Sequence, residues 1–171
     1  SAVNDVTNFI GMADRLHQGL VEFILVTRAA KMQLADLPVI ADNNVQVDTE
    51  NSYYFGGSQG GIFGQTFMAL TPDVERGFLA VPGVNYSMML QRSTGFSPFF
   101  AEMQTVYTNP AGLATAIGAM QLLWDFTDPI SYVRHIKQEP FEGDPREVIM
   151  ALAKGDKQVP VVTMETVARS E

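Results

Sequence analysis

The chain has 171 residues, of which 46% are hydrophobic and 18% are charged, and its formal net charge is −8. This length is enough for one domain with a single substantial core. The 11 basic residues are scattered singly, which argues against a nucleic-acid-binding face. No run of about 20 apolar residues is present to span a membrane. Cysteine is absent, which excludes disulfides, thiolate metal sites and a cysteine nucleophile. We expect neither a metal nor another cofactor.

The hydrophobic pattern predicts helices and strands in alternation. Helical spacing predicts one or two helices over residues 7–31, with Asn4, Asp5 and Thr7 as capping residues. Turn-forming residues predict a loop over 36–50. A strand at 53–55 precedes a helix over 59–70, and a second strand follows over 77–81. Residues 97–136 are expected to form two or three helices, broken at Pro110 and Pro129. An uninterrupted apolar strand over 148–153, of the kind buried in a parallel sheet, precedes a helix over 161–169. This order predicts an α/β fold.

A glycine-rich turn between the first predicted strand and the next helix carries a candidate nucleophile. Its sequence is Gly56-Gly57-Ser58-Gln59-Gly60, and a strand–turn–helix of this pattern lifts the serine hydroxyl above the sheet. Ser58 is then expected to have strained backbone angles, and the backbone N–H of Gln59 is expected to face a developing oxyanion. Gly56 and Gly60 are expected to prevent side-chain collisions across the turn. The alternatives are an idle serine in a glycine turn, or an anion-binding loop that lacks the P-loop lysine.

A hydrolytic serine also needs a base and an acid that orients the base. Asp156 is the candidate acid because it follows the strand predicted over 148–153; a simple turn residue is the alternative reading. Asp125 and Asp128 compete by chain order, but Asp128 precedes a proline as at a helix start. The two histidines, His17 and His135, are both expected on helix surfaces, and His135 precedes Asp156 in the chain.

Three segments resemble the α/β-hydrolase superfamily. Residues 53–61 resemble its nucleophile elbow, and residues 151–160 resemble the acid-bearing loop of its secreted or envelope-associated bacterial members. The predicted helix around residues 13–19 is similar to the one those proteins place before the nucleophile strand. The resemblance covers nearly the whole chain from about residue 5. It implies a serine esterase or lipase-like enzyme that forms an acyl-enzyme on Ser58, uses Asp156 as its acid and acts on small carboxylic esters.

The chain departs from that family at both ends. Complete members have several strands before the elbow and a catalytic histidine after the acid, whereas Asp156 lies near the end of this sequence. We therefore expect residues 1–171 to form a single truncated domain with a short parallel sheet and flanking helices. The upstream oxyanion loop and the triad histidine are expected to be missing. A helical insertion at about 84–136 would resemble a lid.

The insertion is rich in methionine and aromatic side chains, which suit either an acyl pocket or core packing. They are Met88, Met89, Phe96, Phe99, Phe100, Met103, Tyr107 and Trp124. A sheet of about three strands has open edges, and such edges pair readily with another chain. A homo-oligomer, or association with the rest of a parent protein, is therefore expected. The alternative function is a catalytically silent module that self-associates through these edges.

Overall fold

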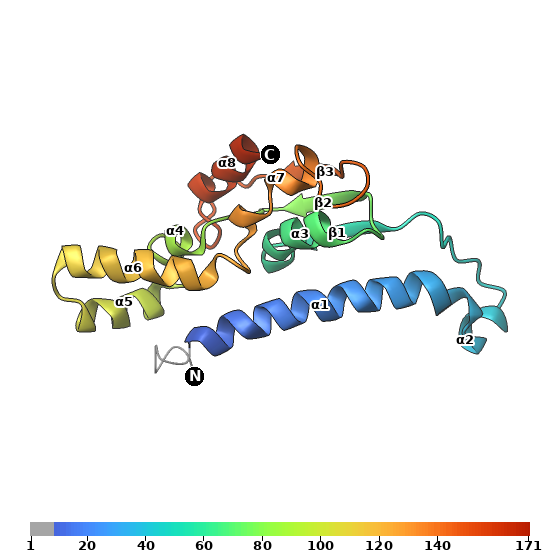
Figure 1. Ribbon diagram of the computed structural model, residues 1–171, viewed down its shortest axis with the longest axis horizontal. Helices are drawn as coiled ribbons and strands as arrows, with labels where there is room; N and C mark the ends of the chain where they lie inside the picture. The colour runs from blue at the N-terminus through green and yellow to red at the C-terminus, as the bar shows by residue number, and fades with distance from the viewer. Residues whose placement is uncertain (1–8) are drawn as a thin grey trace.

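The computed structural model describes residues 9–171, which form a small sheet and the helices around it (Figure 1). The three strands are β1 (Tyr53–Gly57), β2 (Arg76–Ala80) and β3 (Glu147–Ala151). The helices are α1 (Phe9–Gln33), α2 (Pro38–Ala41), α3 (Gln59–Leu70), α4 (Tyr86–Leu90), α5 (Ser97–Val106), α6 (Pro110–Trp124), α7 (Arg134–Lys137) and α8 (Val161–Ser170). Two 3₁₀ turns are η2 (Leu34–Asp36) and η3 (Pro129–Ser131).

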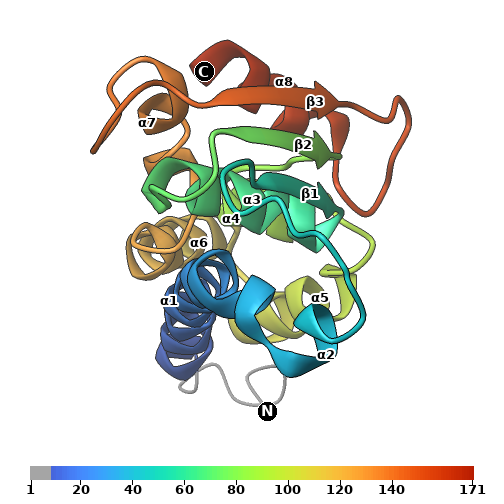
Figure 2. The same cartoon turned by 90° about the vertical axis from the view of Figure 1, so that its right-hand side faces the viewer.

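The sheet has the order β1-β2-β3, and both strand pairs are parallel. Figure 2 shows the three arrows side by side and pointing the same way. Phe55, Phe78 and Ile149 are partners across the three strands. Because the strands run in the same direction, all three carboxyl ends meet at one edge of the sheet. The predicted α/β class, with a short parallel sheet and flanking helices, is confirmed.

Most predicted elements lie where the sequence indicated. The helix predicted over 59–70 is α3, and the final helix differs from its prediction by one residue. Pro110 and Pro129 begin α6 and η3 in the first turn, where the missing proline N–H has no partner to lose. The loop predicted over 36–50 is wrong in part, because Pro38 begins the short helix α2. The capping residues predicted at 4–7 lie outside the described residues.

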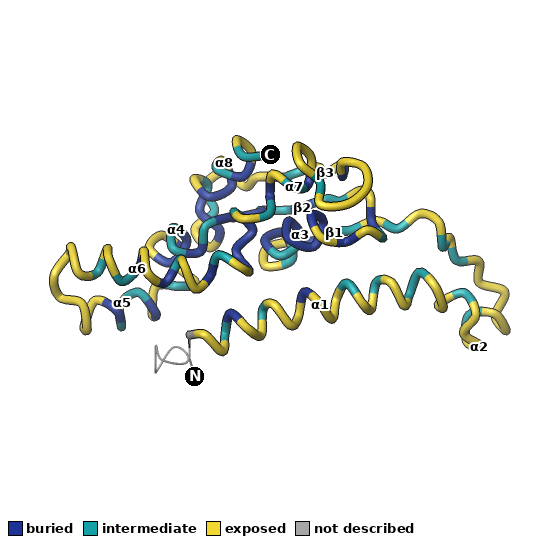
Figure 3. The backbone as a smooth tube through the Cα atoms, in the orientation of Figure 1, coloured by how far each residue is buried: buried dark blue, intermediate teal, exposed yellow. Residues whose placement is uncertain are grey.

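Helix α3 is the central element of the core, and Figure 3 shows it largely in the colour of buried residues. Phe67 and Met68 are almost fully buried, and the ring of Tyr54 on β1 lies 5.0 Å from that of Phe67. On the same face of the sheet, Val148 packs against this cluster, and Met150 packs against a smaller one with Val133, Val167 and Val84. One face of the sheet therefore packs on α3, α7 and α8.

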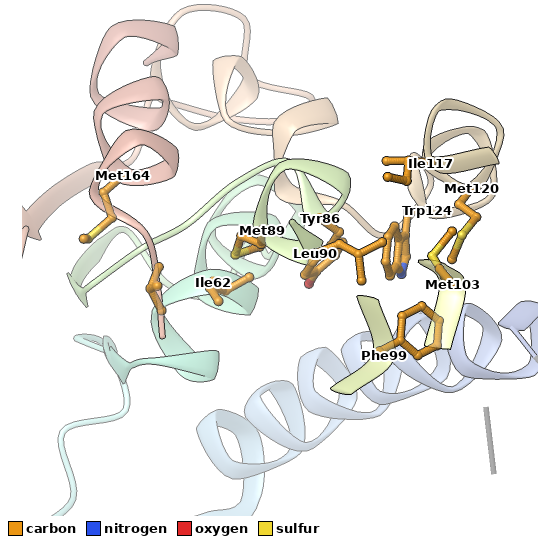
Figure 4. Close-up of a cluster of buried hydrophobic side chains, with 11 residues drawn as sticks. Ile62, Tyr86, Met89, Leu90, Phe99, Met103, Ile117, Met120, Trp124 and Met164 are labelled. Carbon is orange, nitrogen blue, oxygen red and sulfur yellow. The ribbon is translucent and has the colours of Figure 1, made fainter. Parts of the chain in front are cut away.

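The insertion predicted at about 84–136 contributes most of a second core cluster (Figure 4). Three of its methionines, together with Phe99 and Trp124, are buried there, and α3 and α8 supply Ile62 and Met164. Side chains at helical spacing on α4, α5 and α6 meet in this cluster because each short helix has one apolar face. The insertion is thus joined to the sheet domain through a continuous apolar core.

The other face of the sheet is open. Tyr53, Phe55 and Ile149 point to this face and are 67%, 76% and 67% exposed, and the rings of Phe55 and Phe78 stack 5.5 Å apart. The expectation that the strand over 148–153 is buried on both faces is therefore wrong. Strand side chains alternate between faces, and no helix within residues 9–171 covers this one. We call the surface of Tyr53, Phe55, Arg76, Phe78, Glu147 and Ile149 the open sheet face.

Helix α1 runs along the length of the molecule, beside α3 (Figure 1). Ala13 and Leu20 are buried, whereas several other apolar side chains of this helix are exposed, such as Leu25 at 59% and Val26 at 63%. Near its end, Arg28 forms a 3.0 Å ion pair with Asp73, in the turn that follows α3. Over residues 9–171, none of the helices combines the length and apolar character that crossing a lipid bilayer requires.

Asp128 links the start of the insertion, shortly after β2, to its later part at α6 and η3. Its Oδ1 accepts hydrogen bonds from the backbone N–H groups of Asn85 and Ile130, both at 3.0 Å. Its Oδ2 accepts from the N–H of Tyr86 at 2.6 Å and from Nε2 of Gln121 at 2.9 Å. Burial raises the pKa of Asp128 above its ordinary value, and these hydrogen bonds oppose that shift. The carboxyl group therefore satisfies four donors from three segments.

The substitution Asp128→Asn should destabilise the protein, although it barely changes the side-chain volume. One oxygen becomes an NH₂ group, which faces two donors that then have no acceptor. At roughly 1–3 kcal/mol for each of these two buried unsatisfied donors, we expect the free energy of unfolding, measured by urea titration, to fall by about 2–6 kcal/mol. Asp125→Asn is the matched control, because among residues 9–171 the Asp125 side chain accepts one hydrogen bond, from Gln121. Equal stability of the two variants would contradict this role.

Candidate active site

Ser58 lies between the end of β1 and the start of α3, with φ 53° and ψ −118°. A positive φ is uncommon for a residue with a side chain. Its N–H donates to the carbonyl of Ala80 at 3.1 Å, and its own carbonyl accepts from the N–H of Ile62 at 3.0 Å. The turn is thus fixed to both β2 and α3. The expectation of a strand-to-helix turn with strained angles at Ser58 is confirmed.

Two glycines of this turn are required by close backbone approaches. A Cβ on Gly56 would lie 2.3 Å from the carbonyl oxygen of Gly60, and a Cβ on Gly61 would lie 2.2 Å from that of Ala80. A Cβ on Gly60 would meet only the Tyr54 hydroxyl, at 3.7 Å, which is an ordinary contact. The expectation that Gly56 avoids a collision is therefore confirmed, whereas for Gly60 it is wrong. Gly61, which the Gly-x-Ser-x-Gly pattern does not include, lets α3 approach β2.

Tyr54 contacts the serine turn from the side of the core and stabilises it. Its hydroxyl donates to the carbonyl of Gly60 at 2.7 Å, so it satisfies an acceptor in the first turn of α3. Its ring lies against the positions of Gly56 and Gly64, where a Cβ would come within 2.7 Å and 2.4 Å of the ring. Burial raises the pKa of Tyr54, so that the hydroxyl stays protonated and continues to donate at neutral pH.

Strained backbone gathers at this edge of the sheet. Of the four non-glycine residues with positive φ in the described chain, Ser58 follows β1, and Val81 and Asn85 follow β2. Val81 is β-branched, a residue type for which φ of 50° is unusual. Such strain costs about 1–3 kcal/mol per residue and concentrates at functional sites. The carboxyl ends of β1 and β2 are therefore the place to look for a site.

A cavity of about 440 Å³ opens beside Ser58. Its volume lies within the range of roughly 300–1,000 Å³ that is usual for small-molecule pockets. The lining is mainly apolar, with a few polar groups: Met12, Leu16, Ser58, Gln59, Ile62, Phe63, Tyr86, Met89, Ser93, Gly95, Phe96, Trp124, Gln158 and Val159. Some of the insertion's apolar residues thus pack in the core and also line this cavity. Core packing is confirmed, whereas an acyl pocket stays a prediction. A separate cavity of about 680 Å³ is lined by residues that include Arg76 and Lys137, and Ser58 is not among them.

The backbone N–H of Gln59 is placed to bind an anion. Gln59 is the first residue of α3, and the first N–H groups of a helix have no acceptor within it. Within the described chain neither this N–H nor the Ser58 hydroxyl has a hydrogen-bond partner. Both residues are exposed at the cavity. The described structure therefore has a donor and a hydroxyl without partners on consecutive residues; that this N–H binds an oxyanion stays a prediction.

Asp156 follows β3 at the same edge of the sheet as Ser58. Because β1 and β3 are separated only by β2, their carboxyl ends lie roughly 10 Å apart, two strand spacings. Oδ1 of Asp156 accepts from the backbone N–H groups of Gln158 and Val159 at 2.7 and 3.0 Å, and both residues line the cavity. Oδ2 has no partner among residues 9–171. The side chain of Asp156 is thus oriented by its own turn, and its Oδ2 can accept a hydrogen bond from another group.

The two rival carboxylates have other roles. All the oxygens of Asp128 are occupied by the four donors described above, and the side chain is fully buried. Asp128 also precedes η3 and caps it, as its position before a proline indicated. Asp125 accepts from Gln121 at the end of α6. Neither residue lines the cavity beside Ser58.

Neither histidine is placed to serve as the base. His17 is exposed on α1, and its ring packs edge-on against Phe126 at 5.5 Å. His135 lies in α7, where Nδ1 is 2.6 Å from the carbonyl of Glu139 and the ring stacks on Phe141. The carbonyl of Ile136 accepts a hydrogen bond from the N–H of Arg146, which directly precedes β3. Helix α7 therefore adjoins the amino end of β3, whereas Ser58 lies at the carboxyl end of the sheet. In the part of the chain that the structure describes, no group of acidic residues and histidines could hold a metal ion.

The substitution Gly61→Ala should distort the serine turn. The added Cβ would meet the Ala80 carbonyl, which is backbone and cannot rotate away, so we expect a loss of about 3 kcal/mol in the free energy of unfolding. Gly118→Ala on α6 is the matched control, because nothing lies within 4 Å of the new Cβ. That variant should gain about 0.5–1 kcal/mol. Chemical denaturation measures both, and a neutral Gly61→Ala would show that α3 does not depend on this approach.

Comparison of the chain with protein-family models, with curated proteins and with solved structures finds no match. The interpretation of the site therefore depends on its own geometry.

Proposed function

We propose that the chain is the nucleophile-bearing part of a serine hydrolase that acts on carboxylic esters, with Ser58 as the nucleophile. The observation that carries this proposal is the backbone of Ser58, with φ 53° and ψ −118° between a parallel strand and a helix N-terminus. A serine in an ordinary glycine turn has no need of this strain. The turn gives the hydroxyl an exposed position above the carboxyl edge of the sheet, beside an apolar cavity.

The proposed reaction is acyl transfer. The Ser58 hydroxyl oxygen attacks the ester carbonyl carbon while its proton passes to an imidazole, and the N–H of Gln59 stabilises the oxyanion. When the intermediate collapses, the carbon–oxygen bond to the alcohol breaks and the alcohol leaves with that proton. Water then hydrolyses the acyl-enzyme by the same steps. Oδ2 of Asp156 is the acceptor that would orient the imidazole, since Oδ1 is occupied by its own turn.

Turnover of p-nitrophenyl esters, with and without added imidazole, tests this proposal. Without imidazole, we expect the turnover rate to be roughly 10⁴-fold or more below that of an enzyme with a complete triad, because the base is missing from the site. Free imidazole should raise turnover, since a general base contributes about 10²–10⁴-fold when correctly positioned. Ser58→Ala should remove this gain.

The Ser58→Ala variant also corrects for ester hydrolysis by imidazole itself. A gain that is the same in both proteins would exclude Ser58 as the nucleophile. Rapid Ser58-dependent turnover without imidazole would retain Ser58 but would identify His17 or His135 as the base, contrary to their placement in the structure.

A second candidate function is self-association, which the open sheet face supports. Phe55 and Ile149 are among the most exposed large apolar side chains of the chain, and they lie in one row with Phe78. Contiguous apolar surface of this kind marks interaction sites. Within the described residues, β1 and β3 each have one edge that no strand pairs with. We propose that a second copy of the chain covers this face. The two functions do not exclude one another. The cavity beside Ser58 is lined by residues of α1, α3 and the insertion, whereas the open sheet face is the one that α3 does not cover.

Light scattering coupled to size exclusion measures this association directly. The unmodified chain should have the molar mass of a dimer or larger oligomer, and Ile149→Lys should shift it toward the monomer because a lysine ammonium is costly to bury. Leu122→Lys on α6 is the matched control: Leu122 is 73% exposed but lies away from the open sheet face, so this change should have no effect. A monomeric unmodified chain would overturn the proposal.

A further inference from the structure

Tyr86 carries a hydroxyl group that the fold leaves unused. Its side chain is only 6% exposed, and its hydroxyl oxygen is buried without a hydrogen-bond partner in the described structure. An unsatisfied buried hydroxyl opposes folding, and phenylalanine would fill the same space without it. The hydroxyl therefore lacks a partner among residues 9–171, and a bound molecule could supply one.

The position of Tyr86 is fixed from three directions. Its N–H donates to Asp128 at 2.6 Å, its ring lies 5.3 Å from that of Trp124, and the preceding residue, Asn85, caps α4 in a left-handed conformation. Figure 4 shows the tyrosine extending from α4 with its hydroxyl on the side of the cluster that faces α1. That side is where Met12 and Leu16 of α1 line the cavity, as Tyr86 and Ser58 do.

We propose that the Tyr86 hydroxyl donates a hydrogen bond to an oxygen atom of the molecule that occupies the cavity beside Ser58. The site would then select a neutral, mainly apolar molecule that carries a carbonyl or other acceptor oxygen. This inference rests on the proposed function for its connection to ester hydrolysis, and it adds the residue that recognises and positions the substrate.

The chemistry of the cavity supports a neutral ligand. No lysine or arginine is among its described lining residues, so no cationic side chain there pairs with the full charge of a carboxylate or phosphate. The Asp128 carboxyl group lies behind the Tyr86 backbone, and the chain carries a formal net charge of −8, both of which disfavour anions. Burial, aided by the charge of Asp128, raises the pKa of Tyr86, so its hydroxyl keeps its proton and remains a donor.

Two small probes that differ by one carbonyl group test the proposal. Butyrophenone has an acceptor oxygen, whereas butylbenzene has a methylene group in its place. Their dissociation constants can be measured from the emission of Trp124, which is the only tryptophan of the chain and lines the same cavity. The proteins compared are the unmodified chain, Tyr86→Phe, and Tyr107→Phe as a control tyrosine that does not line the cavity.

We expect the unmodified chain and Tyr107→Phe to bind butyrophenone more tightly than butylbenzene, by about 3- to 10-fold, as one hydrogen bond allows. Tyr86→Phe should lose that preference and should bind butylbenzene at least as well. Because it also removes an unsatisfied buried group, Tyr86→Phe should raise the thermal unfolding midpoint by about 2–4 °C. This rise would also show that the variant is folded.

Three results would overturn the inference: an unmodified chain without preference between the probes, a preference that survives in Tyr86→Phe, or no change in Trp124 emission with either probe. Failure of this inference can be distinguished from failure of the proposed function, because the proposed function is tested separately by Ser58-dependent turnover of esters. Turnover that requires Ser58, together with no effect of Tyr86→Phe on probe binding, would retain the hydrolase and reject only the role of Tyr86.

Discussion

The close approach of α3 to the carboxyl end of β2 is the constraint on which the rest of the site depends. Gly61 lies where any side chain would collide with the carbonyl of Ala80, and that same carbonyl accepts the N–H of Ser58. With the helix fixed against the strand in this way, the chain must reverse within one residue, and Ser58 takes the strained angles. The exposed hydroxyl, the free N–H of Gln59 and the adjoining cavity all follow from this contact.

The sequence predicted the sheet and this turn well because their signals are local. Strand residues before the Gly-x-Ser-x-Gly pattern and a helical stripe after it define a strand–turn–helix unit, and the structure has β1 and α3 there, with a positive φ at Ser58. The position of Asp156 at the same sheet edge was predictable for a similar reason, because parallel strands place their carboxyl ends together. That Ser58 and Asp156 act as nucleophile and acid stays a prediction.

Features that depend on contacts distant in the sequence could not be predicted. The apolar run at 148–153 has the composition of a strand buried on both faces, yet Ile149 is 67% exposed, because composition does not reveal whether a helix covers the outer face. The need for Gly61 rather than Gly60 depends on a contact with Ala80 on another strand. The unsatisfied hydroxyl of Tyr86 and the four donors on Asp128 likewise depend on how distant parts of the insertion pack against one another.

A crystal structure of the chain after reaction with a p-nitrophenyl alkylphosphonate, in the presence of imidazole, would show directly whether Ser58 is the nucleophile and Gln59 the oxyanion donor. The phosphonate mimics the tetrahedral intermediate of acyl transfer. We expect a covalent bond from Ser58 Oγ to phosphorus, a phosphonyl oxygen about 2.7–3.1 Å from the backbone nitrogen of Gln59, and the alkyl chain in the cavity. Modification of a different residue, or an adduct on Ser58 whose oxygen points away from Gln59, would contradict this expectation.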